Sequence, residues 1–158
     1  MSIASIALPR IMRIGAGAAR QLPEVMETLG LRNPLIVTDA YLLASGRVAE
    51  LQDMLKAAGF ASRVYADTVP DPTVASIEAG TAYLGEGAHD CVVGFGGGSP
   101  LDSAKAIATL GVHGGRMADY KAPHVQDRPG LPVIAIPTTA GTGSEATRFT
   151  IIADEATD

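Results

Sequence analysis

Segments with helical periodicity recur along the chain, separated by short apolar runs and turn residues. Apolar residues at spacings of three and four predict four helices, over residues 22–29, 48–58, 73–84 and 100–110. Gly30 and Gly59 follow the first two segments, where a glycine favours the left-handed conformation that ends a helix. Thr73 has the side chain of a suitable N-cap for the third.

The short apolar runs between these helices predict strands. They lie at residues 35–38, 62–65, 91–95, 133–136 and 149–152. Continuously apolar strands are typical of a sheet that is buried on both faces. Their alternation with helices indicates an α/β fold, with a Rossmann-like, mostly parallel sheet and helices on both faces. We expect residues 1–158 to form one such domain.

Composition and charge narrow the class of protein. The chain has 12 basic and 17 acidic residues, a net charge of -5, and its basic residues are dispersed, which argues against a nucleic-acid partner. No apolar run approaches the roughly 18 residues of a membrane helix, and the N-terminal residues are too interrupted for a signal peptide. The single cysteine, Cys91, excludes a disulfide framework and is typical of a small core residue. We expect a cytoplasmic protein without a membrane partner.

A glycine-rich loop, Gly96-Gly97-Gly98-Ser99, joins the predicted strand 91–95 to the predicted helix at Pro100. Without Cβ atoms its backbone can turn tightly and approach a ligand closely. The helix that follows presents unpaired N–H groups and the positive end of its dipole, so a phosphate is stabilised there. Ser99 can cap that helix or donate its hydroxyl to a phosphate, and Pro100 suits the first helical position. The loop is therefore a candidate phosphate cradle.

The loop matches known nucleotide-binding fingerprints only in part. Residues 94–99 lack the final glycine of GxGxxG, and no Gly-Lys-Ser/Thr ends the loop as it would in a Walker A motif. In an ordinary Rossmann domain the glycine loop follows the first strand, and the acidic residue comes about 20 positions later. Here the acidic candidate, Asp39, comes before the loop. On the local pattern alone, a tight turn without a ligand is the alternative interpretation.

Two acidic residues are candidates for further contacts at this edge. Asp39 follows the strand at 35–38, and ligands of open α/β sheets bind at the carboxyl ends of strands. Its carboxylate could accept hydrogen bonds from a ribose and would repel a 2′-phosphate, which favours NAD over NADP; the alternative is an N-cap. Asp102 lies three residues before Lys105, where the two can pair on the helix surface or act at the site.

A second polar loop, residues 138–145, follows the predicted strand 133–136. Its hydroxyls and two glycines suit hydrogen bonds to a phosphate, a ribose or a carboxamide, although an ordinary Ser/Thr turn has the same composition. Taken together, GGGSPLDSAK at 96–105 and PTTAGTGSE at 137–145 resemble the paired signatures of the iron-containing (group III) alcohol dehydrogenase family. The resemblance covers essentially the whole chain.

The resemblance implies a cofactor site. In it, Asp39 contacts the adenosine ribose and disfavours NADP, the glycine loop holds the pyrophosphate, and the second loop lines the pyrophosphate and nicotinamide side. Asp71 stands where the family commonly has Asn, which adds a negative charge near the adenine end. The predicted cofactor-binding residues are Asp39, Gly96, Gly97, Gly98, Ser99, Asp102, Thr138, Thr139, Thr142, Thr147 and Phe149.

The family's α/β domain binds NAD(P) beside an all-helical domain that carries a metal ion, usually Fe²⁺, on one Asp and three His. His89, His113 and His124 match none of these ligands and share no ligand spacing. The resemblance therefore implies that Fe²⁺ is bound outside this chain and that no catalytic residue lies within it. We expect the NAD-binding half of a metal-dependent alcohol dehydrogenase, truncated before the helical domain and inactive alone.

Further expectations concern partners and alternatives. The resemblance implies a small alcohol or aldehyde as substrate and a homodimer as the assembly. One alternative is a nucleotide-binding fragment without catalysis. The other is a glycerol dehydrogenase or dehydroquinate synthase-like enzyme of the same superfamily.

Overall fold

The computed structural model describes residues 8–155 and contains one parallel sheet. Its strands are β1 (Pro34–Val37), β2 (Arg63–Tyr65), β3 (Cys91–Gly96) and β4 (Val133–Pro137). They lie in the order β2-β1-β3-β4, and every pair of neighbours is parallel. In the register, Ile36 lies beside Val64 and Val93, and Val93 lies beside Ile134. The predicted α/β fold with a parallel sheet is confirmed.

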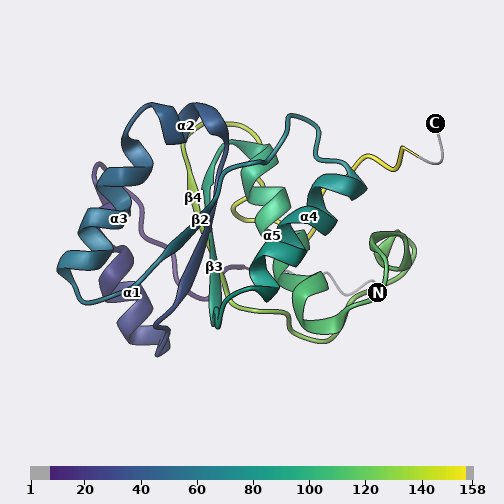
Figure 1. Ribbon diagram of the computed structural model, residues 1–158, viewed down its shortest axis with the longest axis horizontal. Coiled ribbons are helices and arrows are strands. Elements are labelled where there is room, and N and C mark those ends of the chain that lie inside the picture. Colours follow the sequence, from purple (N-terminus) through teal and green to yellow (C-terminus); the bar gives the residue numbers. More distant parts are fainter. Residues whose placement is uncertain (1–7, 156–158) are drawn as a thin grey trace, which may run out of the picture.

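Helices cover both faces of the sheet (Figure 1). One layer contains α1 (Leu22–Leu29), α2 (Ala40–Ala44) and α3 (Arg47–Ala57), and the other contains α4 (Val74–Gly85) and α5 (Gly98–His113). Two short 3₁₀ helices accompany these layers: Ala18–Gln21 leads directly into α1, and Met117–Tyr120 contacts α4. Helical connections between parallel strands cover the faces of the sheet, which is what the sequence alternation indicated.

The core is divided by the sheet into two clusters. Ile36 and Val93 face α1 and α3, whereas Leu35, Val37 and Val92 face α4 and α5. All five are fully buried. Each such side chain contributes about 1.5–3 kcal/mol relative to exposure. Burial on both faces explains why β1 and β3 are apolar at nearly every position.

Several predicted elements are confirmed and three details differ. The helix at 22–29, its glycine stop, and the N-cap at Thr73 are as predicted. The helix α2 was not predicted, because only five residues separate its N-cap from its C-cap and periodicity needs a longer segment. The helix α5 begins at Gly98, not at Pro100, and its N-cap is Gly97. The N–H groups of the first helical turn have no partner within the helix. A proline, which lacks an N–H, therefore fits at any position of that turn and does not identify the first one.

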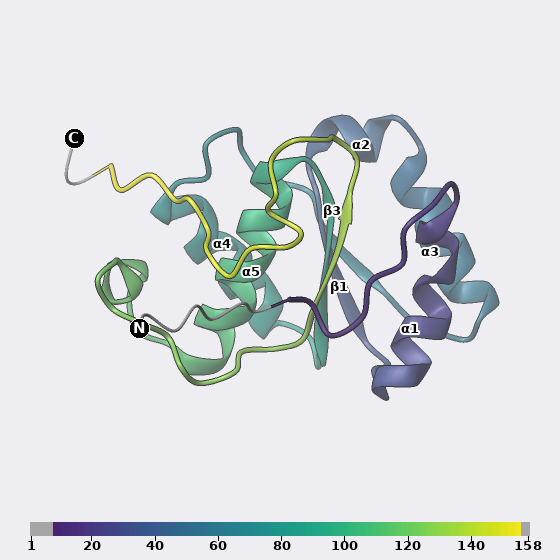
Figure 2. The ribbon, with the colours of Figure 1, turned by 180° about the vertical axis from the view of Figure 1, so that it is seen from behind.

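The predicted strand at 149–152 is wrong. These residues have no strand conformation, and among residues 8–155 the nearest ladder contact is an isolated bridge between Ala153 and Thr73. The segment after β4 instead curves back across α5 (Figure 2). Its β-branched residues favoured a strand locally, but the backbone bonds to a helix side chain in place of a ladder.

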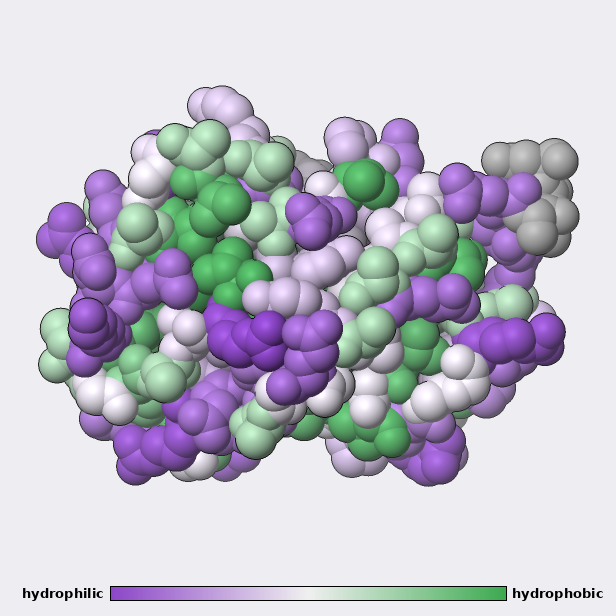
Figure 3. Space-filling view, viewed as in Figure 1, coloured by the Kyte–Doolittle hydropathy of each residue, from purple (hydrophilic) through white to green (hydrophobic). Residues whose placement is uncertain are grey.

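The described surface is mixed in polarity. Figure 3 shows hydrophobic and hydrophilic residues interspersed over one face, with a cluster of hydrophobic residues in the region of α2. Tyr41 and Leu43 of this helix are exposed. None of the helices in residues 8–155 is long and apolar enough to cross a bilayer.

Candidate nucleotide-binding site

The strand order creates a switch point between β1 and β3. From β1 the chain crosses to β2 on one side, and from β3 it crosses to β4 on the other side. The connections after β1 and β3 therefore diverge, leaving a crevice at the carboxyl ends of these two strands. Asp39 follows β1 and Gly96 ends β3, so both predicted features lie at this crevice.

The glycine loop makes a tight turn into α5. Gly96 is buried with φ +152°, and a Cβ atom there would lie 2.6 Å from Cγ of Pro100. A side chain is thus excluded at this position by both conformation and space. Gly97 is the N-cap, and no described side chain hydrogen-bonds to the first N–H groups of α5. Ser99 lies half-buried in the first turn. The backbone N–H groups at this helix terminus are available for an anion.

The second predicted loop packs directly against the first. The N–H of Thr138 donates to the carbonyl oxygen of Gly96 at 2.8 Å. A Cβ on Gly97 would lie 3.3 Å from Oγ1 of Thr139. A Cβ on Gly98 would lie 3.2 Å from Cγ2 of Thr142. The structure therefore brings together the two loops that the sequence paired, and threonine side chains border the uncapped helix terminus.

Asp39 is the N-cap of α2. Its Oδ1 accepts a hydrogen bond from the N–H of Leu42 at 2.8 Å. The helix it caps reaches the glycine loop, since Cδ1 of Leu42 would lie 3.4 Å from a Cβ on Gly96. The capping interpretation of Asp39 is thus confirmed, and a ribose contact stays a prediction. One carboxylate can serve both, because capping uses only one of its oxygens.

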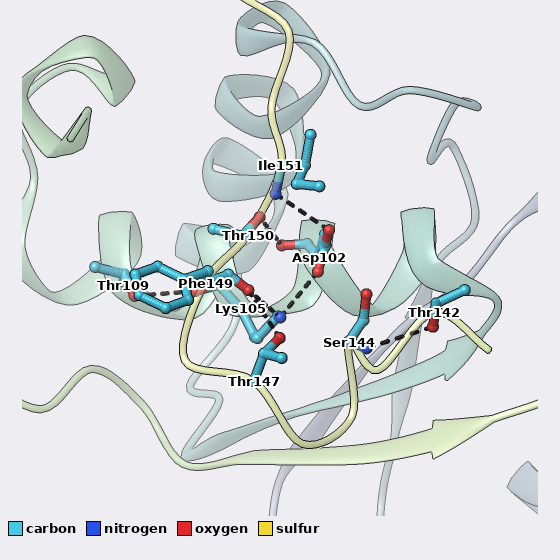
Figure 4. A network of polar contacts seen from close by, with 9 residues as sticks. All are labelled: Asp102, Lys105, Thr109, Thr142, Ser144, Thr147, Phe149, Thr150 and Ile151. Carbon is cyan, nitrogen blue, oxygen red and sulfur yellow. Dashed lines mark hydrogen bonds and ion pairs between the residues drawn. The ribbon is translucent and has the colours of Figure 1, made fainter. Parts of the chain in front are cut away.

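Asp102 and Lys105 form the pair that was one of the two interpretations of their spacing, but the pair is covered and does not lie on the surface. Nζ of Lys105 lies 2.8 Å from Oδ1 of Asp102, and the two side chains are only 17% and 10% exposed. The segment after the second loop covers them (Figure 4). Oδ2 of Asp102 accepts from the N–H of Ile151 at 3.1 Å. Both carboxylate oxygens are therefore engaged within the protein.

Thr147 and Phe149 lie where the second loop leads into this covering segment. Oγ1 of Thr147 is 3.4 Å from the carbonyl oxygen of Phe149, and the Phe149 residue is 82% exposed. An exposed aromatic ring at the edge of a crevice can stack on a planar ligand or contact another part of a longer protein. Its cofactor role stays a prediction.

Two hollows on the described part of the surface lie away from the glycine loop. A hollow of about 630 Å³ lies at the amino end of β2, between residues of α3 and the following turn. A smaller one, about 270 Å³, borders the end of the second loop at Glu145–Arg148 and the segment Leu8–Pro9. Neither hollow is lined by the glycine loop.

Metal ligands and a reactive thiol are not features of this site. Within residues 8–155, no three His, Cys, Asp or Glu side chains lie close enough together to hold a metal ion. Burial raises the pKa of the Cys91 thiol to about 12, so it is protonated at neutral pH. This agrees with its predicted place in the core.

Two contacts of the glycine loop were missed at the level of sequence. Leu42 packs near Gly96, and buried Ser144 has its Oγ 3.5 Å from a Cβ position on Gly98. Leu42 gave no signal, because an apolar residue in a helix predicts only core packing. Ser144 lies inside the recognised loop motif, so its position in PTTAGTGSE was the available indication.

Comparisons with known proteins agree with this geometry. The family model described as iron-containing alcohol dehydrogenase matches residues 9–158. The long-chain-alcohol dehydrogenase 1 of Geobacillus thermodenitrificans is 40% identical over 160 residues, covering 99% of this chain and 40% of the relative.

Two solved structures extend the similarity to the fold. A 1,3-propanediol oxidoreductase aligns with a TM-score of 0.93 at 29% identity, covering 99% of this chain and 41% of the other. The sulfoacetaldehyde reductase from Bifidobacterium kashiwanohense, in complex with NAD⁺, aligns with a TM-score of 0.89 at 31% identity, with the same coverage. The chain thus spans about two fifths of the length of the relatives it matches.

Proposed function

The chain belongs to the iron-containing alcohol dehydrogenase family, and we propose that it is the NAD-binding part of a metal-dependent alcohol dehydrogenase. The observation that carries the proposal is the N-terminus of α5, which no described side chain caps and which the Thr139 and Thr142 side chains border. The backbone N–H groups and the positive dipole end of an uncapped helix suit a pyrophosphate. The similar sulfoacetaldehyde reductase is itself described in complex with NAD⁺.

Each part of the site has a proposed role. Gly96, Gly97, Gly98 and Ser99 hold the pyrophosphate through backbone N–H groups and the Ser99 hydroxyl. Asp39 accepts from the adenosine ribose with the oxygen that does not cap α2. Thr138, Thr139 and Thr142 line the pyrophosphate and nicotinamide side, and Thr147 and Phe149 supply further cofactor contacts.

The activity belongs to a longer protein. Bound NAD supplies the hydride acceptor for oxidation of an alcohol, and this part of the chain binds and orients it. The described residues do not fit a metal site, so we assign the iron to the part of the longer protein outside this chain. Several relatives are named as alcohol dehydrogenases, and one as a lactaldehyde reductase, which supports a small alcohol or aldehyde as the substrate. The assembly we propose is a homodimer.

Cofactor preference tests the proposal. NAD and NADP would be titrated into the wild-type chain and into Asp39→Gly by calorimetry. We expect wild type to bind NAD at least about tenfold more tightly than NADP, because a carboxylate a few ångströms from a 2′-phosphate repels it. In Asp39→Gly the difference should largely disappear. Equal affinity of wild type for the two cofactors would contradict the role given to Asp39.

The matched control separates charge from capping. Asp39→Asn keeps a good N-cap for Leu42 and removes the negative charge. We expect it to bind NADP more tightly than wild type while unfolding at nearly the same temperature. If only Asp39→Gly alters the preference, helix fraying and not charge is the cause.

A further inference from the structure

The segment that follows the second loop is fastened to α5 by one compact group of contacts (Figure 4). Nζ of Lys105 donates to the carbonyl oxygen of Phe149 and pairs with Asp102. Asp102 in turn accepts from the N–H of Ile151, and its own carbonyl accepts from Oγ1 of Thr150 at 3.1 Å. Residues 149–151, Asp102 and Lys105 are called the latch below.

The latch closes the second loop at one end. At the other end the loop is held by the hydrogen bond from Thr138 to Gly96. Beyond the latch, the segment is next held at Ala153, whose N–H donates to the carbonyl oxygen of Pro72. Without the latch, the free stretch after β4 would therefore lengthen by several residues and gain conformational freedom. The loop rests on Gly97 and Gly98, so its freedom affects the surface that faces the pyrophosphate.

The geometry also argues against direct contact of Asp102 or Lys105 with the cofactor. Both oxygens of Asp102 are in use, and both side chains are mostly covered. A ligand would have to reach a carboxylate whose Oδ2 already accepts from the N–H of Ile151 and whose Oδ1 lies beside the Lys105 ammonium group. An unpaired carboxylate one turn into α5 would moreover repel a phosphate at the N-terminus, and Lys105 offsets that charge.

We propose that Asp102 and Lys105 are positioning residues: they hold residues 149–151 on α5 and thereby keep the second loop closed on Gly97 and Gly98. The proposal rests on the NAD-binding function above, because its consequence for binding requires that the loop borders the cofactor. It reassigns Asp102 from a contact with the cofactor to a contact with the segment that shapes the site.

Amide hydrogen exchange without ligand tests the latch itself. Lys105→Met keeps most of the side-chain stem and removes the ammonium group. We expect amides of residues 139–151 to exchange about tenfold faster in this variant, while those of β1 and β3 keep their protection. Lys105→Arg retains a cation that can reach both acceptors, and it should restore most of the protection. Unchanged exchange at 139–151 in Lys105→Met would overturn the proposal.

NAD titration tests the consequence for binding. We expect Kd to rise about tenfold for Lys105→Met, since charge-assisted hydrogen bonds are the stronger ones. Thr150→Val is the decisive variant, because it loosens the latch from the segment side and alters no charge. It should raise Kd about threefold. If Lys105→Met weakens NAD while Thr150→Val binds as wild type does, the pair acts on the cofactor directly and the proposal fails.

A matched ion pair elsewhere provides the control. Arg116 and Asp119 are also three residues apart, at 3.2 Å, but are exposed and far along the chain from the loop. Arg116→Met should leave both exchange at 139–151 and the Kd for NAD within about twofold of wild type. Should Lys105→Met fail to fold, Thr150→Val and Lys105→Arg still decide the question. Absence of NAD binding by wild type would reject the proposed function, and the exchange data would still decide whether the latch holds the loop.

Discussion

The N-termini of α4 and α5 are built in opposite ways. Oγ1 of Thr73 accepts from the N–H of Ser76 at 3.2 Å, and Oγ of Ser76 accepts from the N–H of Thr73 at 3.0 Å. This reciprocal capping box satisfies the terminus of α4 from within the chain. At α5 the N-cap is Gly97, which has no side chain, and no described side chain takes its place.

The difference shows how helix N-termini of one fold can serve two purposes, one stabilising the helix and the other binding a ligand. A helix terminus satisfied by its own side chains has little left to offer an anion, whereas an uncapped one keeps its N–H groups and dipole for a ligand. The cost to the fold is small, because glycine is a tolerable N-cap. Packing reinforces the difference at α5, where the missing Cβ atoms let the second loop approach Gly97 and Gly98.

The most severe test converts the terminus of α5 into one like that of α4. Gly97→Asp would place a capping carboxylate on the N–H groups that face the ligand. We expect the Kd for NAD to rise about 100-fold through repulsion of the pyrophosphate. The cap itself should stabilise the fold by only a few tenths of a kcal/mol relative to glycine, and Oγ1 of Thr139, 3.3 Å from the new Cβ, must shift slightly to make room. Calorimetry and thermal unfolding measure the two effects.

The neutral variant Gly97→Ser is the control for this change. It supplies a cap without charge, so it should weaken NAD less than Gly97→Asp does. Equal losses in the two variants would show that the side chain's contact with Thr139, and not anion repulsion, weakens binding. Unchanged NAD affinity in Gly97→Asp would contradict the claim that the uncapped N-terminus of α5 binds the cofactor.

The reverse test removes the cap of α4. Thr73→Ala should lower the free energy of unfolding by about 1 kcal/mol and leave the Kd for NAD unchanged. Thr81→Ala provides the comparison, since Oγ1 of Thr81 bonds only to the carbonyl of Ile77 within the helix. This second variant should be neutral or slightly stabilising, because alanine is the better helix former. A weaker affinity for NAD in Thr73→Ala at unchanged stability would show that the N-terminus of α4 contributes to the nucleotide-binding site.

The smallest effect is expected in the turn that leads into α4. Asp71 has φ +49°, in the left-handed region where Asn and Asp are the best-tolerated side chains after glycine. Asp71→Asn should therefore change the free energy of unfolding by less than about 0.5 kcal/mol. NAD affinity, measured by titration, should stay within about twofold of wild type. Tighter NAD binding in this variant would show that the Asp71 charge lies within reach of the cofactor.

Much of the framework could be predicted from sequence because its signals are local. The apolar runs of β1 and β3, the stop at Gly30 and the cap at Thr73 each depend on residues within a few positions. The start of α5 was placed two residues late, since Pro100 is compatible with any position of a first turn. The strand expected at 149–152 failed because its backbone partner is Asp102, about 50 residues away in sequence.

The sequence by itself determined the alternation of strands and helices, the glycine and threonine loops, and the family that these motifs indicate. Only the tertiary structure decided that Thr139 and Thr142 lie on Gly97 and Gly98, and that the terminus of α5 is uncapped. It alone showed that Asp102 and Lys105 are covered and hold residues 149–151. The physical reason is one of range: propensity and capping act between neighbours, whereas burial and side-chain pairing depend on which distant segments the sheet brings together.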